Sequence, residues 1–479
     1  MTNYDAVVVG SGPNGLTAAI ELARAGKSVA VLEANDTIGG GMRSAELTLP
    51  GFVHDLCSAI HPLAAASPAF RTMPLDQHGL EWLHPPLPLA HPFDDGTAAV
   101  LDRSLDVTAE LLGPDGRAYR KLMAPLLNES ERFLSVMLGP MSAGRVSLPS
   151  PRVIPGLLHF SRHGLRPAAG LASASFRDDA ARALLAGMAA HVNLPLDNMV
   201  TGGFGLIIGL LGHATGWPLA RGGSQKIADA LGSYLATLGG EVLPGREVRS
   251  MRDLPPARAV LFDLTPRQLL AIAGERLPPR FRRTLRRFRY GPGVYKIDWA
   301  LDGPVPWKAE ACHRAGTVHV CGTLNEIKAS EEGNKRGRHA ERPYVLIAQQ
   351  SLFDPSRAPQ DKQTLWGYCH VPHGSTVDMT ERVEAQLERF APGFRDRIVA
   401  KATMSPAQVE AHDANYIGGD INGGIQDIRS LFVRPSARWV PYSTPAKDIY
   451  ICSSSSPPGG GVHGMCGYHA ARAALRRAF

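Results

Sequence analysis

A glycine-rich turn near the amino terminus most constrains what this chain can fold into. Residues 4–33 read YDAVVVGSGPNGLTAAIELARAGKSVAVLE. The apolar run 6–9 is typical of a buried strand, 16–25 has the small residues of a closely packed helix, and 27–32 predicts a second strand that ends on Glu33. A strand, a glycine turn, a helix and a second strand with a terminal acid together form a unit that binds a dinucleotide.

Each part of this unit has a physical role. Gly10 permits the tight turn, Gly12 lets the backbone approach a pyrophosphate, and Gly15 lets helix and strand pack closely. The helix start offers free N–H groups to phosphates. Glu33 can accept hydrogen bonds from ribose hydroxyls and would repel the 2′-phosphate of NADP. The cofactor-binding residues predicted here are Gly10, Gly12, Pro13, Asn14, Gly15, Glu33 and Ala34.

The next glycine cluster favours FAD over NAD. Residues 38–44 read IGGGMRS, which resembles the GGxxR(S/T) signature of the glutathione-reductase-like flavoproteins, a group that includes amine oxidases and phytoene desaturases. The glycines allow close backbone approach, and Arg43 supplies a positive fork for phosphate or flavin oxygens. An ordinary glycine loop with a surface arginine is the alternative. The predicted contacts are Gly40, Gly41, Met42 and Arg43.

A third flavin contact is predicted near the carboxyl terminus. An apolar strand at 449–452 runs through a Ser, Pro and Gly loop into an alanine-rich helix. A strand that leads through glycines into a helix start is suited to negative charge, here the pyrimidine edge of a reduced flavin. His463 either tunes the flavin or only packs the loop. The predicted contacts are Gly461, Val462, His463, Gly464 and Met465.

Bulk composition narrows the class. The chain has 479 residues, enough for two or three domains, and its 44% hydrophobic and 20% charged content is typical of a globular enzyme. The sequence has no run of 18 apolar residues and no signal peptide ahead of the first strand, so a cytoplasmic protein is expected. Its six cysteines lack CxxC spacing, which argues against a dithiol centre and gives no metal pattern.

A basic stretch at 276–289, RLPPRFRRTLRRFR, stands apart from this even composition. Phe281, Leu285 and Phe288 would share one helical face between the arginines. Such a helix either packs its apolar face on the domain or lies on an anionic membrane as a peripheral contact. No nucleic-acid module accompanies it, so nucleic acid is not an expected partner.

Motifs along nearly the whole chain carry a family resemblance. They are GSGPNGLTAAIELARAG at 10–26, GFVHDLCSAIHPLAAASP at 51–68, GWPLARGGSQ at 216–225, YGPGVYKIDWALDGPVPW at 290–307, GGDINGG at 418–424 and CSSSSPPGGGVHGMCGYHAA at 452–471. In combination they resemble the phytoene desaturase-like FAD-dependent oxidoreductases, most of all the branch called pyridine nucleotide-disulfide oxidoreductase domain-containing protein 2. The branch name implies disulfide chemistry, for which this chain has no cysteine pair.

The resemblance implies an α/β fold with a Rossmann-like FAD-binding domain of the glutathione-reductase type and a substrate domain of mixed sheet and helices. It implies a discontinuous FAD domain from 1–70, 215–290 and 430–479, and a substrate domain from 71–214 and 291–429. Val248 would contact the adenine through its backbone. FAD is expected to be non-covalent, with NAD(P)H not the tightly bound cofactor.

The resemblance also implies oxidation, saturation or isomerisation at a C–C bond of a lipophilic or amphipathic substrate, with quinone, oxygen or NAD(P) as the electron acceptor. His61 is the candidate catalytic acid or base, although a structural hydrogen bond would equally explain a buried histidine. Lys296 could lie near flavin N5, as a lysine does in amine oxidases. A flavin amine oxidase and a non-catalytic flavin-binding partner protein are the rival functions.

Overall fold

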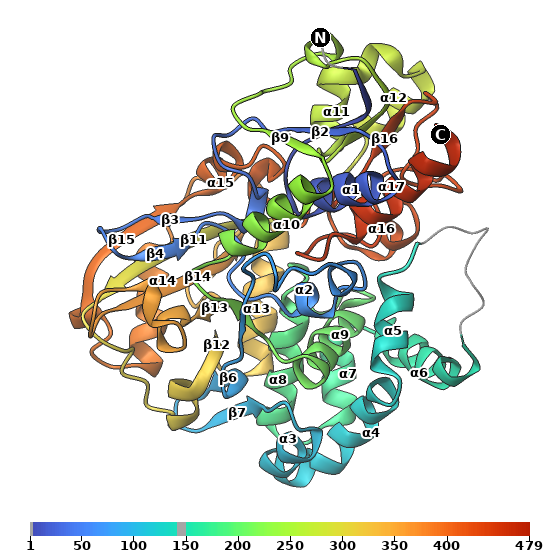
Figure 1. Cartoon of the computed structure of the whole chain (residues 1–479). Coiled ribbons are helices and arrows are strands. Elements are labelled where there is room, and N and C mark those ends of the chain that lie inside the picture. Colours follow the sequence, from blue (N-terminus) through green and yellow to red (C-terminus); the bar gives the residue numbers. More distant parts are fainter. Residues whose placement is uncertain (1–2, 141–149) are drawn as a thin grey trace.

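A computed structural model describes residues 3–140 and 150–479. Its first sheet has five parallel strands, and α1 (Pro13–Arg24), α10 (Gln225–Thr237) and α17 (Met465–Arg477) cover one face. Short helices α11 (Pro266–Ala273) and α12 (Pro279–Arg286) cover the other, at the top of Figure 1. The strand order is β16 (Ile449–Ile451), β10 (Ala257–Phe262), β1 (Tyr4–Val9), β2 (Val29–Leu32) and β9 (Glu241–Leu243). This confirms the predicted α/β fold with a Rossmann-like domain.

Local sequence explains why this sheet forms. Its strands are short apolar runs buried on both faces, as parallel strands between two helix layers must be. Pro13 lies in the first turn of α1, where a missing N–H costs nothing. Gly15 lets α1 lie against β1, because a Cβ there would be 2.0 Å from the Gly10 carbonyl oxygen.

The second sheet has seven strands and is mixed. All neighbouring strands are antiparallel except β12 and β6. One face packs on α14 (Thr380–Phe390) through a cluster that includes Trp299 and Phe390, and the other faces the interior. The strand order is β15 (Ile398–Met404), β11 (Gly293–Leu301), β14 (Gln363–Val371), β13 (Val345–Ala348), β12 (Ala315–Val320), β6 (Leu87–Pro92) and β7 (Ala98–Leu101).

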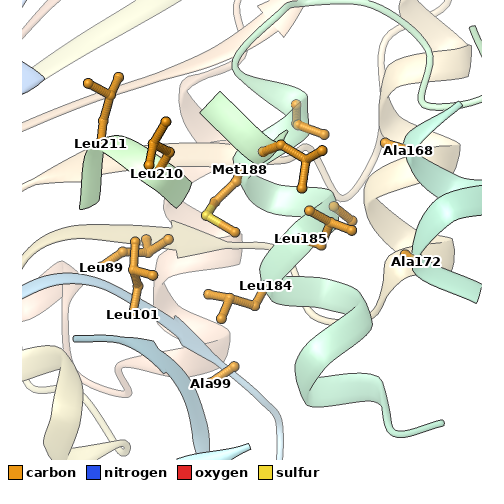
Figure 2. Packing of buried hydrophobic residues seen from close by; sticks show 14 of the residues in the cluster. Leu89, Ala99, Leu101, Ala168, Ala172, Leu184, Leu185, Met188, Leu210 and Leu211 are labelled. Atoms are coloured by element: carbon orange, nitrogen blue, oxygen red, sulfur yellow. The ribbon is translucent and has the colours of Figure 1, made fainter. Parts of the chain in front are cut away.

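A helical layer packs beside this sheet in the lower right of Figure 1. Figure 2 shows its core, where Leu184 and Met188 of α8 lie beside Leu89 and Leu101 of β6 and β7. All four side chains are buried. The helices are α3 (Leu105–Leu111), α4 (Gly116–Leu127), α5 (Ser130–Met137), α6 (Ile154–Gly164), α7 (Ala168–Ser175), α8 (Asp179–Ala190) and α9 (Thr201–Ala214).

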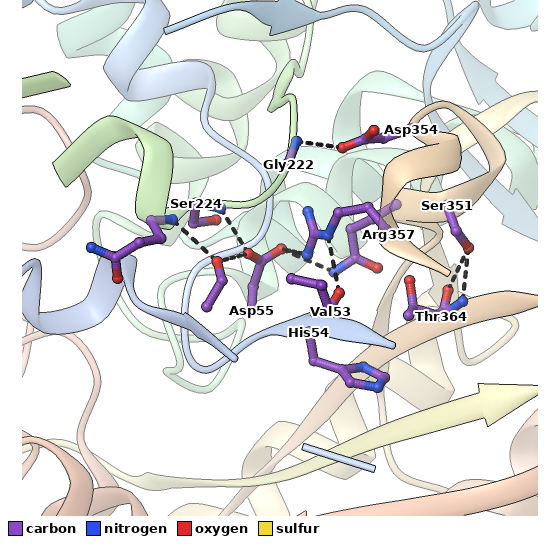
Figure 3. Close-up of polar contacts among 12 residues, drawn as sticks. Val53, His54, Asp55, Gly222, Ser224, Ser351, Asp354, Arg357 and Thr364 are labelled. Atoms are coloured by element: carbon purple, nitrogen blue, oxygen red, sulfur yellow. Dashed lines mark hydrogen bonds and ion pairs between the residues drawn. The ribbon is translucent and has the colours of Figure 1, made fainter. Parts of the chain in front are cut away.

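A buried ion pair links the two sheet regions. Arg357 donates to Asp55 at 2.8 Å, and both side chains are at most 1% exposed (Figure 3). Asp55 also accepts from the Ser224 backbone N–H at 2.8 Å, at the start of α10. The connecting elements are β3 (Ser44–Glu46), β4 (Val53–Asp55), α2 (Pro62–Ala66), β5 (Trp82–Leu83), β8 (Leu219–Ala220), α13 (Leu324–Lys335), α15 (Pro406–His412) and α16 (Ile428–Phe432).

The basic stretch is partly helical, as α12. Phe281 and Leu285 are 8% and 2% exposed and pack on the first sheet's outer cluster, so this apolar face is not free to enter a lipid layer. The arginines 280, 283, 286 and 287 are exposed. Across the described ranges, no helix is both long and apolar enough to cross a membrane.

Candidate functional site

A cavity of about 440 Å³ lies where the two sheet regions meet. The glycine turn after β1 forms one end of its wall, and the interior face of the seven-stranded sheet forms the other. The predicted site residues that line it are Gly10, Gly12, Pro13, Asn14, Glu33, Ala34, Gly40, Gly41, Arg43, His61, Val248, Gly461 and Val462.

Five predicted residues stand behind this wall: Gly15, Met42, His463, Gly464 and Met465 are not among its lining residues. Met42 is fully buried in the core. The His463 Nδ1 accepts a hydrogen bond from the Met465 N–H at 3.0 Å, so this imidazole holds the first residue of α17. Gly464 adopts φ +67° beside Thr17, where a Cβ would lie 2.2 Å from the Thr17 Oγ1. The spacing of these residues is therefore explained by the docking of α17 on α1.

Glu33 is fixed as an ionised acceptor at the end of β2. Its carboxylate accepts from the Ser11 N–H at 2.9 Å and Oγ–H at 2.6 Å, and from the Asn35 N–H at 2.9 Å. Burial raises the pKa of the Glu33 carboxyl, but these hydrogen bonds outweigh it and hold the pKa below its usual value. A carboxylate is thus kept where the sequence pattern predicts a ribose contact.

Arg43 is less free than its motif suggests. Its Nε donates to the Gly40 carbonyl at 3.0 Å, and its guanidinium also donates to the His412 carbonyl at 2.5 Å. The side chain is 5% exposed and lines the cavity. Arg43 therefore braces the second glycine cluster and places a buried positive charge in the wall.

Asp263 was missed as a site residue. It follows β10, lines the cavity, and accepts a hydrogen bond from the Gly15 N–H at 2.9 Å. Burial raises the pKa of this carboxyl to about 8, and the nearby Asp413 and Glu33 add to the rise. Near neutral pH Asp263 keeps its proton and adds no negative charge beside the turn. The signal was present, since the apolar run 257–262 ends on this acid as β2 ends on Glu33.

His61 lies at the cavity wall between the two ends. Its Nε2 shares a hydrogen bond with the Ser224 Oγ at 2.7 Å, and its Nδ1 is buried with no partner among the described residues. Burial lowers the pKa of His61 to about 4, so the ring is neutral at physiological pH. The structural hydrogen bond exists, and a second ring nitrogen still faces the cavity region; its catalytic role stays a prediction.

The sheet end of the cavity is apolar and aromatic. Trp366 and Tyr368 alternate on β14 and project on one face, with their rings 5.1 Å apart in an edge-on contact. Leu346 and Ala348 of β13 pair with them across the sheet and also line the cavity. These wall residues come from separate strands, and only register brings them together.

Lys296 is the cation of this wall. Its ammonium forms an ion pair with Asp298 and lies 6.0 Å from the centre of the Trp366 ring. The side chain is 4% exposed and lines the cavity. Burial raises the pKa of Asp298 to about 6, against the opposing pull of Lys296. A positive charge is therefore held between the two ends.

The fold and this cavity define a dinucleotide-binding protein of glutathione-reductase-like architecture. A family model described as an NAD(P)-binding Rossmann-like domain matches residues 8–73. The pyridine nucleotide-disulfide oxidoreductase domain-containing protein 2 of Mus musculus is 26% identical, over 99% of this chain and 93% of that protein. The predicted resemblance to phytoene desaturase-like FAD-dependent oxidoreductases is confirmed along nearly the whole chain.

Other relatives and solved structures agree with this assignment of the fold. One of the two limonene dehydrogenase polypeptides of Castellaniella defragrans is 22% identical over 98% of this chain and 94% of its own length. The neurosporene-forming phytoene desaturase of Rhodobacter capsulatus is 25% identical over 55% and 54%. An oxidoreductase from Methanosarcina mazei has a TM-score of 0.65 at 15% identity, covering 98% and 99%. A putrescine oxidase bound to putrescine has 0.62 at 18%, covering 99% of each chain.

Proposed function

We propose that this protein is an oxidoreductase that binds FAD non-covalently and oxidises, saturates or isomerises a C–C bond of an apolar or amphipathic substrate. One observation carries the proposal. The same cavity joins a dinucleotide-type glycine turn to an apolar, aromatic sheet wall. A cofactor seated on the turn would reach toward that wall, where an apolar molecule fits.

The residues of the turn end fit FAD. Gly12 faces the cavity without a side chain, and Glu33 supplies the carboxylate for a ribose. The buried Asn14 Oδ1 and His61 Nδ1 belong to lining residues and have no partner in the part of the chain that the structure describes. Because buried polar atoms are normally hydrogen-bonded, these two atoms indicate a polar ligand. Asp263 keeps its proton near neutral pH and so does not repel a diphosphate.

The chain's own residues bind, orient and exclude water. FAD, when bound, supplies the capacity to accept or return a hydride. The sheet face made of Val294, Leu346 and Trp366 offers an apolar surface that keeps water from the reacting carbon. Lys296 holds a positive charge at the junction, where it can orient a water or a polar substrate atom.

The names of two relatives support an apolar substrate. One is part of a limonene dehydrogenase and the other is a phytoene desaturase, and both named compounds are hydrocarbons. The apolar wall of this cavity suits the same chemical class. The substrate of this chain is therefore proposed to be a hydrocarbon or a molecule with a small polar group.

A specific observation favours amine oxidation as the second candidate. An amine oxidase needs paired aromatic side chains beside the flavin, and near the carboxyl terminus the sequence offers only Tyr468. The ring of Tyr468 instead stacks with Arg472 on α17 and does not line the cavity. Trp366 and Tyr368 supply an aromatic pair from β14, with Lys296 beside it.

Flavin reduction under anaerobic conditions separates the two candidates. Purified protein should be yellow, and acid precipitation should release the flavin into the supernatant; colour in the pellet would show covalent attachment. In stopped-flow mixing, apolar alkenes or amphipathic alcohols should bleach the flavin. Rapid bleaching by primary amines alone would establish the amine oxidase. A flavin that no substrate of either class reduces would favour a non-catalytic binding protein.

A further inference from the structure

Two polar atoms in the apolar end of the cavity have no partner in the part of the chain that the structure describes. They are the Thr317 Oγ1 on β12 and the Trp366 Nε1 on β14. Thr317 is 4% exposed and Trp366 is 8% exposed, and both line the cavity. Leaving such an atom unsatisfied costs about 1–3 kcal/mol each. Their position therefore points to a ligand that completes them.

The two atoms lie on one face of the sheet. Thr317 pairs with Ala348, and Ala348 pairs with Trp366, so the three side chains form a row across β12, β13 and β14. His319 is two residues beyond Thr317 and projects on the same face. The polar groups thus share the wall with Leu346 and Ala348.

A histidine pair adds a third polar group. His191 lines the cavity, and its Nε2 lies 2.9 Å from the His319 Nε2. Burial lowers the pKa of His191 to about 3, and that of His319 falls well below its usual value. Both rings are therefore neutral, and one must donate while the other accepts. His319 fixes the orientation of His191 at the wall.

The charge of this end selects against ions. The lining carboxylates Glu33, Glu247, Asp263 and Asp413 belong to the nucleotide end, and within the described residues none comes from the seven-stranded sheet. The ammonium of Lys296 is already paired with Asp298. A cationic substrate group would meet this positive charge without a counter-ion. A neutral group that both donates and accepts hydrogen bonds suits the wall better.

We propose that Thr317, Trp366 and His191 form a subsite for a hydroxyl or carbonyl group on an otherwise apolar substrate. This inference rests on the proposed function, since it assumes that the sheet end holds the substrate. It narrows the substrate class from hydrocarbons in general to oxygen-bearing ones. The indole N–H donates to the oxygen, and the threonine hydroxyl donates or accepts.

Three probes with one carbon skeleton test the subsite. They are perillyl alcohol, limonene and perillylamine, each measured by equilibrium dialysis against the flavin-loaded protein. One added hydrogen bond should make the alcohol bind about fivefold to tenfold more tightly than the hydrocarbon. The amine should bind no better than the hydrocarbon. Equal binding of alcohol and hydrocarbon would overturn the proposal, as would a preference for the amine.

A matched pair of variants assigns the effect to the wall. Thr317→Val removes the hydroxyl at nearly constant volume and should reduce the alcohol's advantage to about twofold or less, with limonene affinity unchanged. Thr364→Val is the control, because the Thr364 Oγ1 is also buried without a partner among the described residues but does not line the cavity. It should leave the advantage intact. An alcohol preference that survives Thr317→Val would overturn the subsite.

The outcomes also separate this inference from the proposed function. If none of the probes binds, the apolar cavity itself is not the substrate site and both ideas fail. If limonene binds and reduces the flavin but the alcohol has no advantage, only the subsite fails. Binding is read at equilibrium, so the result does not depend on turnover.

Discussion

The two ends of the cavity are built in different ways. The nucleotide end takes most of its wall from neighbouring residues, 9–14, 32–35 and 40–43, with a few contacts from later segments. The sheet end takes Val294, Thr317, Leu346 and Trp366 from four strands, with His191 from beyond α8. The first is determined by local spacing, and the second by strand register. A motif therefore identifies the cofactor class, while only the assembled fold shows the substrate wall.

The nucleotide end should break completely at one position. Gly12→Val should abolish FAD binding, because the Cβ would lie 2.7 Å from the Asp263 Oδ2 and the methyl groups would enter the cavity. The flavin-to-protein absorbance ratio after purification measures this. Gly170→Val is the control, since no atom lies within 4 Å of a Cβ there. Full flavin content in Gly12→Val would contradict the assignment of the turn.

The joint between the two ends should be the next most sensitive place. Arg357→Met leaves Asp55 charged and buried without its partner and should lower the free energy of unfolding by about 3–5 kcal/mol. Arg249→Met is the control, because its ion pair with Glu247 is exposed and should change stability by less than about 1 kcal/mol. Denaturant titration monitored by tryptophan fluorescence compares them. Equal midpoints would show that the buried pair does not stabilise the junction.

The same contrast explains how much could be predicted from sequence. The strand before Gly10, the helix after it and Glu33 at the end of β2 follow from local patterns, so this part of the fold was predictable. The strands at 293–301 and 365–371 were also predicted, but their pairing was not. Strand register between residues far apart in the chain has no local signal, so Trp366 could not be placed beside Lys296. His463 was placed in the site because the loop pattern does not show that its ring caps α17.

Lys296 tests the sheet end. Lys296→Met should slow flavin reduction by about tenfold to a hundredfold, because a positioned proton-transfer or orienting group is lost, while flavin content stays unchanged. Lys401→Met on the neighbouring strand β15 serves as the control, since its ammonium pairs with Glu384 and lies outside the cavity wall. Single-turnover reduction with the best substrate gives the rates. Unchanged rates in Lys296→Met would remove this residue from the chemistry.

Asp263 gives the nucleotide end a pH dependence. The folded-state pKa of this carboxyl is raised to about 8, so the group is neutral below that pH and ionises above it. Ionisation places a negative charge beside the cofactor's diphosphate, and FAD affinity should fall about tenfold between about pH 7 and pH 9.5. Titration of the apoprotein with FAD measures this. Asp263→Asn should give a flat profile, and a wild-type profile without a decline would contradict the proposed role.

The smallest expected effect concerns the surface of α12. A peripheral membrane contact through 276–289 remains a proposal, and it would rest on the arginines because Phe281 and Leu285 are buried. Each arginine near an anionic surface contributes about 1 kcal/mol, an attraction that salt screens. Flotation with phosphatidylserine vesicles should therefore recover less protein at high salt, and less of Arg283→Gln/Arg286→Gln at any salt. Binding that resists salt, or a double variant that floats like the wild type, would show that α12 does not make the contact. Neither result would change the nucleotide end, since both arginines are exposed and lie outside the cavity wall.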